Sequence, residues 1–221
     1  MRILSMADLH GRAEKLFPLK GMDVDLITFC GDLHNLGTID QARPVAEALA
    51  GLGPPVLIVP GNMDSKEIVP ELWNVSGLRT IHRSSYRHGD CGFIGFGGMV
   101  IPDPIRLKYK NLYFHTDDDI YESLTRLYGD ISDSRYKIVL AHQPPRNSRD
   151  LIYNGESGGS VGLRLFVEDF QPDLLLCGHI HENRGEAKIG STKVINVGEM
   201  RRGYYAIIEL NDEIGVEWIE P

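Results

Sequence analysis

Five short apolar segments of this chain each run directly into residues that can bind a metal ion. The segments are residues 2–7, 23–30, 55–59, 136–141 and 173–177. The motifs at their ends are Asp8-Leu9-His10, Gly31-Asp32, Gly61-Asn62-Met63-Asp64, Ala141-His142 and Gly178-His179-Ile180-His181. Apolar runs of this length are typical of buried strands in a parallel sheet. The carboxyl ends of such strands meet at one edge, which is where open α/β sheets bind ligands.

The rest of the chain supplies helices and further strands. Three segments show the spacing of amphipathic helices, at residues 38–50, 116–128 and 161–170. Thr116 is a predicted helix cap, and residues 93–96 are a predicted strand. Residues 184–220 are predicted to form antiparallel strands with turns at 189–191 and 211–213. This pattern favours an α/β fold with two packed sheets and helices on their outer faces.

Composition limits the class of protein. The 221 residues contain no Ser/Gly/Pro linker, which favours one domain over residues 1–221. The net charge of -8 argues against a general nucleic-acid binder but is compatible with a small phosphorylated substrate. The three cysteines, Cys30, Cys91 and Cys177, form no CxxC pair, which predicts reduced core thiols and a cytoplasmic location. We expect no signal peptide and no membrane span.

The ligand types in the motifs predict a metal centre. Asp8 and His10 are two residues apart, so on an extended strand end both side chains would point the same way. Each short motif alone also has a plain structural reading, as a turn or a helix cap. The pair His179 and His181 is more specific, because two imidazoles after a glycine at a strand end have few structural uses. Together the motifs offer enough carboxylate, amide and imidazole ligands for two divalent ions.

In their types and order these motifs resemble the calcineurin-like metallophosphoesterase family. Residues 142–182 further resemble a prokaryotic branch of predicted phosphoesterases within it. The resemblance implies a four-layer sandwich with two central mixed β-sheets flanked by helices. It also implies two divalent metal ions, with Mn foremost and Fe, Zn, Ni or Co as alternatives. By motif, the first ion would be held by Asp8, His10 and His181, the second by Asn62, His142 and His179, and both by Asp32.

The same resemblance implies how an ester would be hydrolysed. A hydroxide bridging the metals would attack phosphorus, with Asp32, Asn62 and His142 as the catalytic residues that hold hydroxide and phosphate. Most catalytic members carry His at the position of Met63, where it contacts the phosphate and protonates the leaving group. Met cannot donate a proton, so we predict a preference for phosphodiesters or activated esters. His34 is a candidate substitute acid, and a surface loop histidine is the alternative reading.

Substrate contacts are predicted from residues near the motifs. Arg146 and Arg149 follow the His142 motif and are expected at the substrate mouth, since Arg binds phosphate through a planar fork. Gly159 and Ser160 begin a predicted helix, where their backbone N–H groups would bind a phosphate or simply cap the helix. Residues 102–113 are rich in basic and aromatic side chains and are predicted to form a lid.

These expectations describe a metal-dependent phosphoric ester hydrolase, in the first place a phosphodiesterase. Its partner would be a small phosphorylated or nucleotide-like substrate, with no stable nucleic acid and no membrane. A phosphomonoesterase or nucleotide pyrophosphatase is the alternative within enzymes. A non-catalytic metal-binding interaction scaffold is the alternative of another class, although the complete ligand set favours an enzyme. The roles of Glu199, Met200 and Arg201, the oligomeric state and the substrate's identity stay open.

Overall fold

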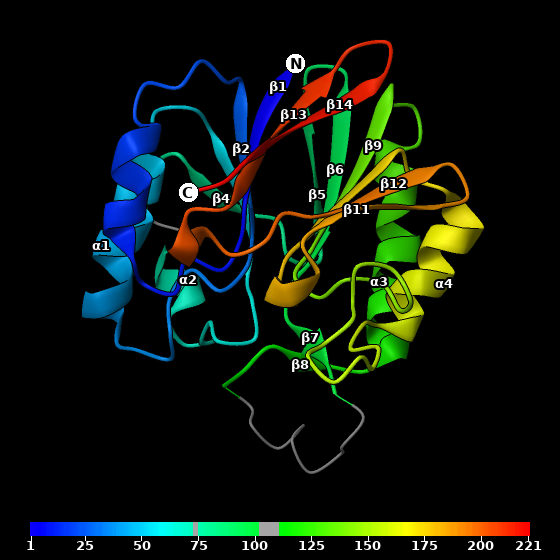
Figure 1. The fold of residues 1–221 in the computed structure, drawn as a ribbon, viewed down its shortest axis with the longest axis horizontal. Helices are drawn as coiled ribbons and strands as arrows, with labels where there is room; N and C mark the ends of the chain where they lie inside the picture. The colour runs from blue at the N-terminus through cyan, green and yellow to red at the C-terminus, as the bar shows by residue number, and fades with distance from the viewer. Residues whose placement is uncertain (73–74, 102–110) are drawn as a thin grey trace.

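Two six-stranded sheets pack face to face in this protein, and helices cover both outer faces (Figure 1). The computed structural model describes residues 1–72, 75–101 and 111–221. Both sheets contain parallel and antiparallel pairs, so the expected four-layer sandwich with two central mixed sheets is confirmed. No helix within the described ranges combines the length and apolar character that crossing a membrane requires.

The first sheet holds the N-terminal strands and the last hairpin of the chain. Its strands are β1 (Arg2–Met6), β2 (Leu26–Cys30), β3 (Val56–Val59), β4 (Leu78–Thr80), β13 (Tyr205–Leu210) and β14 (Ile214–Ile219). They lie in the order β14-β13-β1-β2-β3-β4. Strands β1 to β4 are parallel, whereas β13 is antiparallel to β1 and to β14. The carboxyl ends of β1, β2 and β3 therefore lie at one edge.

The second sheet holds the middle of the chain. Its strands are β5 (Ser84–His88), β6 (Cys91–Phe96), β9 (Tyr136–Ala141), β10 (Leu174–Cys177), β11 (Gly185–Ile189) and β12 (Thr192–Asn196). Their order is β11-β12-β10-β9-β6-β5, with β6, β9, β10 and β12 parallel. A separate small sheet pairs β7 (Met99–Val100) with β8 (Phe114–His115). Both predicted C-terminal hairpins form, and they enter different sheets.

Helices cover the outer face of each sheet. The α-helices are α1 (Ile39–Ala50), α2 (Val69–Leu72), α3 (Asp117–Tyr128) and α4 (Val161–Phe170). Helices α1 and α2 lie outside the first sheet, and α3 and α4 lie outside the second (Figure 1). Short 3-10 helices include η1 (Ala13–Leu19), η3 (Gly129–Ile131), η4 (His181–Asn183) and η5 (Met200–Arg202). Thr116 caps α3 as predicted, because its side chain accepts a hydrogen bond from Asp119 N.

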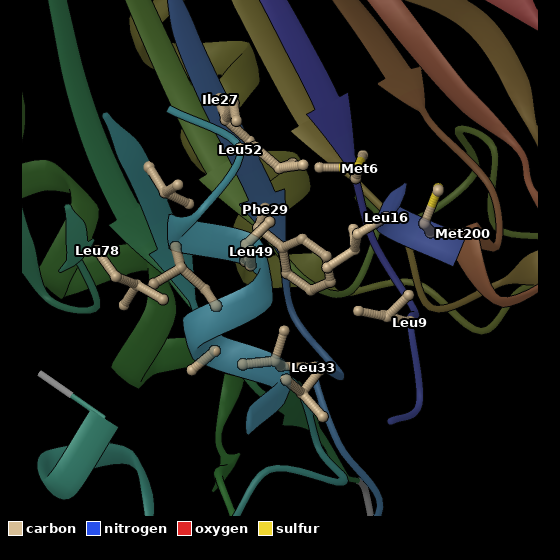
Figure 2. Close-up of a cluster of buried hydrophobic side chains, with 14 of the residues drawn as sticks. Met6, Leu9, Leu16, Ile27, Phe29, Leu33, Leu49, Leu52, Leu78 and Met200 are labelled. Carbon is tan, nitrogen blue, oxygen red and sulfur yellow. The ribbon is translucent and has the colours of Figure 1, made fainter. Parts of the chain in front are cut away.

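Three apolar layers separate these four layers of structure. The outer side of β2 packs Ile27 and Phe29 against the α1 layer, which includes Leu49 (Figure 2). The opposite side of β2 packs Leu26 and Cys30 into the core between the sheets. A third core lies between the second sheet and helices α3 and α4. Burial on both faces explains why β2 is apolar throughout. All three cysteines are free and buried, which confirms their placement in the core.

Candidate metal centre

Five loops meet where the parallel strands of both sheets end. The loop after β1 is hydrogen-bonded to the loop after β2, because Asp8 N donates to Gly31 O at 2.9 Å and His10 N donates to Asp32 O at 3.0 Å. The two sheets are joined at this edge by His142, whose Nδ1 donates to Cys30 O at 2.7 Å. The sheet packing therefore brings the motifs of the first sheet against those of the second.

The carboxylate of Asp32 lies between two imidazoles. Asp32 Oδ2 is 3.9 Å from His10 Nε2 and 3.6 Å from His142 Nε2. On the His10 side, Asp8 Oδ1 lies 3.9 Å from His10 Nε2 and 3.1 Å from His181 Nε2. Two groups that can each hold a metal ion result: Asp8 with His10 and His181, and Asp8 with Asp32 and His142. Asp32 thus occupies a position from which one carboxylate reaches both sides of the centre.

The remaining two expected ligands lie on the His142 side. Asn62 Oδ1 is 3.0 Å from His142 Nε2, and the ring centroid of His179 is 4.9 Å from that of His142. The backbone N–H of His179 also donates to Asp8 Oδ2 at 2.9 Å. All seven residues predicted as metal ligands therefore gather in one cluster at the shared edge of the sheets.

The unpaired atoms of this cluster fit divalent cations. Asp8 is fully buried, and its Oδ1 has no partner with hydrogen-bond geometry. His142 already donates from Nδ1, so in its neutral form the lone pair of Nε2 faces the oxygens of Asp32 and Asn62. His10 Nδ1 lies 2.6 Å from Asn35 Oδ1, which leaves the lone pair of Nε2 directed at the centre. A cation between these lone pairs would satisfy them together.

The electrostatics of the cluster also favour a bound cation. Burial raises the pKa of Asp32 well above its ordinary value, and the negative charges of Asp64 and Asp8 raise it further. Burial and the nearby His142 lower the pKa of His179 to about 3, so this imidazole is neutral and available as a ligand at ordinary pH. Two divalent charges would relieve the carboxylate repulsion without protonating the imidazoles.

The loops present these side chains from an unusual backbone conformation. Asp8, His10, Asp32 and His179 have φ values of 57°, 50°, 56° and 66°. A residue other than glycine costs ~1–3 kcal/mol in such a conformation. The prediction that Asp8 and His10 share a direction on an extended strand end is therefore wrong in its reason. Strand β1 ends at Met6, and two left-handed residues direct the side chains into the centre instead.

Asp64 holds two of these loops together, a role that was not predicted. It is 2% exposed, and its Oδ2 accepts hydrogen bonds from Gly61 N at 2.7 Å and Asp32 N at 2.9 Å. Its carboxylate also accepts from Leu33 N and His34 N. The loops after β2 and β3 are thereby fixed by one side chain. The signal was present in the sequence as the acidic residue that ends the third motif.

Known proteins share both the sequence pattern and the fold. A family model for calcineurin-like phosphoesterases matches residues 1–183. The chain belongs to the calcineurin-like phosphoesterase family. Membership of this family supports the activity of a metal-dependent phosphoester hydrolase and implies a dimetal centre. The Asp and His groups described above are candidates for that centre. An uncharacterised protein of Methanocaldococcus jannaschii is 30% identical over 203 residues, covering 89% of this chain and 87% of its own.

Solved structures of low identity show the same fold. A Thermus thermophilus protein is 18% identical and has a TM-score of 0.78, covering 99% of this chain and 98% of its own. A dimetal phosphatase from Danio rerio is 12% identical with a TM-score of 0.68, covering 99% and 95%. The calcineurin-like phosphoesterase YfkN from Bacillus subtilis is 12% identical with a TM-score of 0.61, covering 99% and 90%.

Met63 occupies the position at which, by the resemblance described above, most catalytic members of the family carry His. Its backbone N–H donates to Asp32 Oδ1 at 2.7 Å and so orients the central carboxylate. His34, the candidate substitute acid, is 3% exposed, so the surface-loop alternative is wrong. Its Nε2 lies 3.6 Å from Asp64 Oδ1, which places the ring beside the carboxylate that joins the loops.

The two arginines that were expected to contact the substrate lie in different surroundings. Arg146 is exposed and lines a groove of about 440 Å³ together with Val100, Gln143 and Gly158. The guanidinium of Arg149 lies against the backbone of Gly185 at the start of β11. The proposed lid includes residues 102–110, which lie outside the described part of the chain.

The expected phosphate site at Gly159 and Ser160 requires a correction. Gly159 N donates to Asp150 Oδ2 at 3.0 Å, and Ser160 N donates to Pro144 O at 2.9 Å. The Ser160 side chain accepts from Leu163 N as the N-cap of α4. Since both N–H groups already have protein partners, the capping alternative describes these residues and the phosphate-binding prediction is wrong.

Adding Mn²⁺ to chelator-treated protein is expected to raise its melting temperature. A ligand at 100 times its Kd stabilises the folded state by about 2.7 kcal/mol. For a chain of this size, that corresponds to roughly 5–10 °C. Differential scanning calorimetry with and without metal measures the shift. The variant Asp118→Asn, at an exposed position on α3, should shift as the wild type does. An unchanged melting temperature in saturating metal would contradict a metal centre in this cluster.

Proposed function

We propose that this protein is a dimetal phosphodiesterase, with manganese as its metal, that hydrolyses a small phosphorylated or nucleotide-like substrate. The observation that carries the proposal is the position of Asp32, whose carboxylate lies within 3.9 Å of imidazoles on both sides of the centre. A single carboxylate shared in this way suits two cations held side by side. Bound there, two divalent ions supply Lewis-acid chemistry and an acidified water for attack on phosphorus.

The protein's own residues hold this centre rigid. His142 is fixed through its Nδ1 hydrogen bond to Cys30 O, and His10 is fixed through Asn35. Asn62 contributes a neutral oxygen, which limits the negative charge that a phosphate must approach. Asp32 is held by the N–H of Met63. These contacts orient the ligands before metal or substrate arrives, and such preorganisation favours the charge that develops in the transition state.

Cys30, which ends β2 beside the centre, is not suited to act as a nucleophile. Burial raises the pKa of the Cys30 thiol, and the negative charge of Asp8 raises it further. The thiol therefore stays protonated at neutral pH, whereas a thiolate is the reactive form. This supports hydrolysis by an activated water, without a covalent enzyme intermediate.

The proposed preference for phosphodiesters or activated esters over simple monoesters depends on Met63. Expulsion of an alkoxide from a simple monoester requires a proton, which a thioether cannot supply. Activated leaving groups need no acid. Hydrolysis of bis-(p-nitrophenyl) phosphate should therefore exceed that of an alkyl phosphomonoester when both are tested with Mn, Ni, Co, Mg and Zn. A protein that binds metal yet hydrolyses neither ester would support the scaffold alternative and contradict the proposal.

Placing His at position 63 is expected to raise turnover of alkyl phosphomonoesters by about tenfold. General acid catalysis contributes ~10²–10⁴-fold when the acid is well placed, and a newly introduced imidazole should recover part of that. The measurement is kcat for an alkyl phosphate in Met63→His and wild type under saturating Mn²⁺. Met63→Leu serves as the matched control, since it changes the side chain without adding an acid. Equal kcat values in all three proteins would count against this explanation of the diester preference.

A further inference from the structure

The segment from Asn196 to Gly203 lies against the candidate metal centre. In the sequence, it follows the region that the family model matches. Met200 N donates to Ala7 O at 2.8 Å, and Arg201 N donates to Asp8 O at 3.0 Å. Asn196, which is fully buried, donates from Nδ2 to Ile180 O at 2.8 Å. This segment therefore braces both the loop after β1 and the loop after β10, which carry four of the candidate ligands.

Met200 fixes the orientation of this segment. Its side chain is 1% exposed and belongs to the core that also contains Met6, Leu9 and Leu16 (Figure 2). Glu199 precedes η5 and Arg201 lies within it, and neither residue belongs to that core. Glu199 and Arg201 are instead paired with each other beside the metal centre.

The carboxylate of Glu199 faces the outer nitrogen of a candidate metal ligand. Glu199 is 3% exposed, and its Oε2 lies 3.5 Å from His181 Nδ1. On the other side of the ring, His181 Nε2 lies 3.1 Å from Asp8 Oδ1. A carboxylate behind a metal-binding imidazole fixes its tautomer and its orientation and makes the inner nitrogen a better ligand.

The other oxygen of Glu199 pairs with an arginine that lies beside the loop after β1. Arg201 Nε donates to Glu199 Oε1 at 2.7 Å, and Arg201 Nη2 lies 2.5 Å from the same oxygen. Both pairings leave Nη1 outside the ion pair, and 44% of the side chain remains exposed. The backbone N–H of Arg201 donates to Asp8 O at 3.0 Å, which places this residue beside a candidate ligand.

We propose that Glu199 is a positioning residue that orients His181 and holds Arg201 as a contact for the phosphoryl group of the substrate. A guanidinium offers two parallel N–H donors that match phosphate oxygens. This inference rests on the proposed function, because it assigns the arginine to the same phosphoester site. It adds a binding element contributed by residues beyond 183.

Replacing Glu199 by Gln tests the first half of the proposal. Gln keeps the shape but loses the charge behind His181, so Mn²⁺ affinity measured by calorimetry should fall ~10–100-fold. The melting temperature of the metal-free protein shows whether the variant is folded. If Glu199→Gln does not fold, Glu199→Asp keeps the charge but moves it back by one methylene, and the same loss is expected. Wild-type affinity in a folded variant would overturn the positioning role.

Comparing Arg201→Ala with Arg202→Ala tests the second half. Arg202 Nε lies 3.3 Å from Glu199 Oε2, but its side chain is 66% exposed. Both variants thus remove one cationic partner of the same carboxylate. Arg201→Ala should raise KM at least ~10-fold with kcat changed far less, since it removes a charged hydrogen bond to the substrate. Arg202→Ala should stay within about twofold of wild type. Equal KM values in the two variants would overturn the assignment of Arg201.

Two readouts separate failure of this inference from failure of the proposed function. Inorganic phosphate titrated into the Mn²⁺-loaded proteins reports Arg201 without any hydrolysis, and its affinity should fall at least ~10-fold in Arg201→Ala alone. A wild type that binds metal and phosphate but hydrolyses no ester would overturn only the proposed function. A wild type that hydrolyses esters with unchanged phosphate affinity in Arg201→Ala would overturn only this inference.

Discussion

Asp32→Asn is expected to lose hydrolysis of bis-(p-nitrophenyl) phosphate by at least ~10²–10³-fold in saturating Mn²⁺. The carboxylate lies 3.9 Å from His10 Nε2 and 3.6 Å from His142 Nε2, so one side chain serves both halves of the centre. Its amide replacement carries no charge and offers one oxygen in place of two. Groups that stabilise developing charge directly are typically worth factors of this size. Steady-state rates at several Mn²⁺ concentrations distinguish lost catalysis from weaker metal binding.

The same variant should be more stable than wild type when metal is absent. Burial and neighbouring carboxylates hold the pKa of Asp32 above its unfolded-state value, so its ionised form opposes folding at neutral pH. Asn removes that charge while its Oδ1 can still accept the hydrogen bond from Met63 N. A chelated Asp32→Asn protein should therefore melt higher than chelated wild type. Full activity, or a lower melting temperature under these conditions, would contradict the assigned place of Asp32.

Asp64→Ala is expected to cost the fold roughly 3–5 kcal/mol of unfolding free energy. The carboxylate accepts from four backbone N–H groups, in residues Asp32, Leu33, His34 and Gly61. Each buried donor left without an acceptor costs ~1–3 kcal/mol, and a buried charged network costs more when one partner is removed. Urea denaturation in the presence of a chelator measures this loss of unfolding free energy in the metal-free protein. The metal-free protein is suitable because Asp64 is not among the candidate ligands.

Asp64→Asn is the matched variant for this experiment. Its one carbonyl oxygen can keep part of the network, so the loss should be smaller than in Asp64→Ala. Unchanged m-values would show that the comparison reports stability and not a change in the unfolded state. If Asp64→Ala unfolded within 0.5 kcal/mol of wild type, a threshold of about the size of neutral surface substitutions, the bracing role would be wrong.

Local sequence patterns predicted the strands that carry the centre. The apolar run that forms β2 is buried on both faces, so its hydrophobicity is a direct consequence of the layered packing. The motifs at the strand ends were equally visible, because ligand chemistry depends on residue type. The prediction that Asp8 and His10 share a direction because they lie on an extended strand end was wrong in its reason. The periodicity of the sequence does not show that both residues adopt left-handed backbone conformations. Such conformations are imposed by the surrounding loops.

Long-range pairing decided what the sequence left open. Hairpin turns were predicted for both C-terminal strand pairs, yet nothing local assigns β11 and β12 to one sheet and β13 and β14 to the other. Because the two hairpins lie in different sheets, the segment that connects β12 to β13 passes the ends of the strands. There the carboxylate of Glu199 lies close to the ring of His181. The same uncertainty affected Ser160, whose backbone N–H and hydroxyl donate to Pro144 O and Asp117 Oδ1, two partners that are distant in sequence.

By itself, the amino-acid sequence determined the alternation of strands and helices and the identities of the candidate metal-binding side chains. Both are local properties, set by hydrophobic period and by the chemistry of each residue. Only the tertiary structure decided which oxygens and nitrogens face one another, as when Asp32 comes to lie between His10 and His142. Those distances arise from the packing of two sheets across a shared apolar layer, which no short stretch of chain encodes.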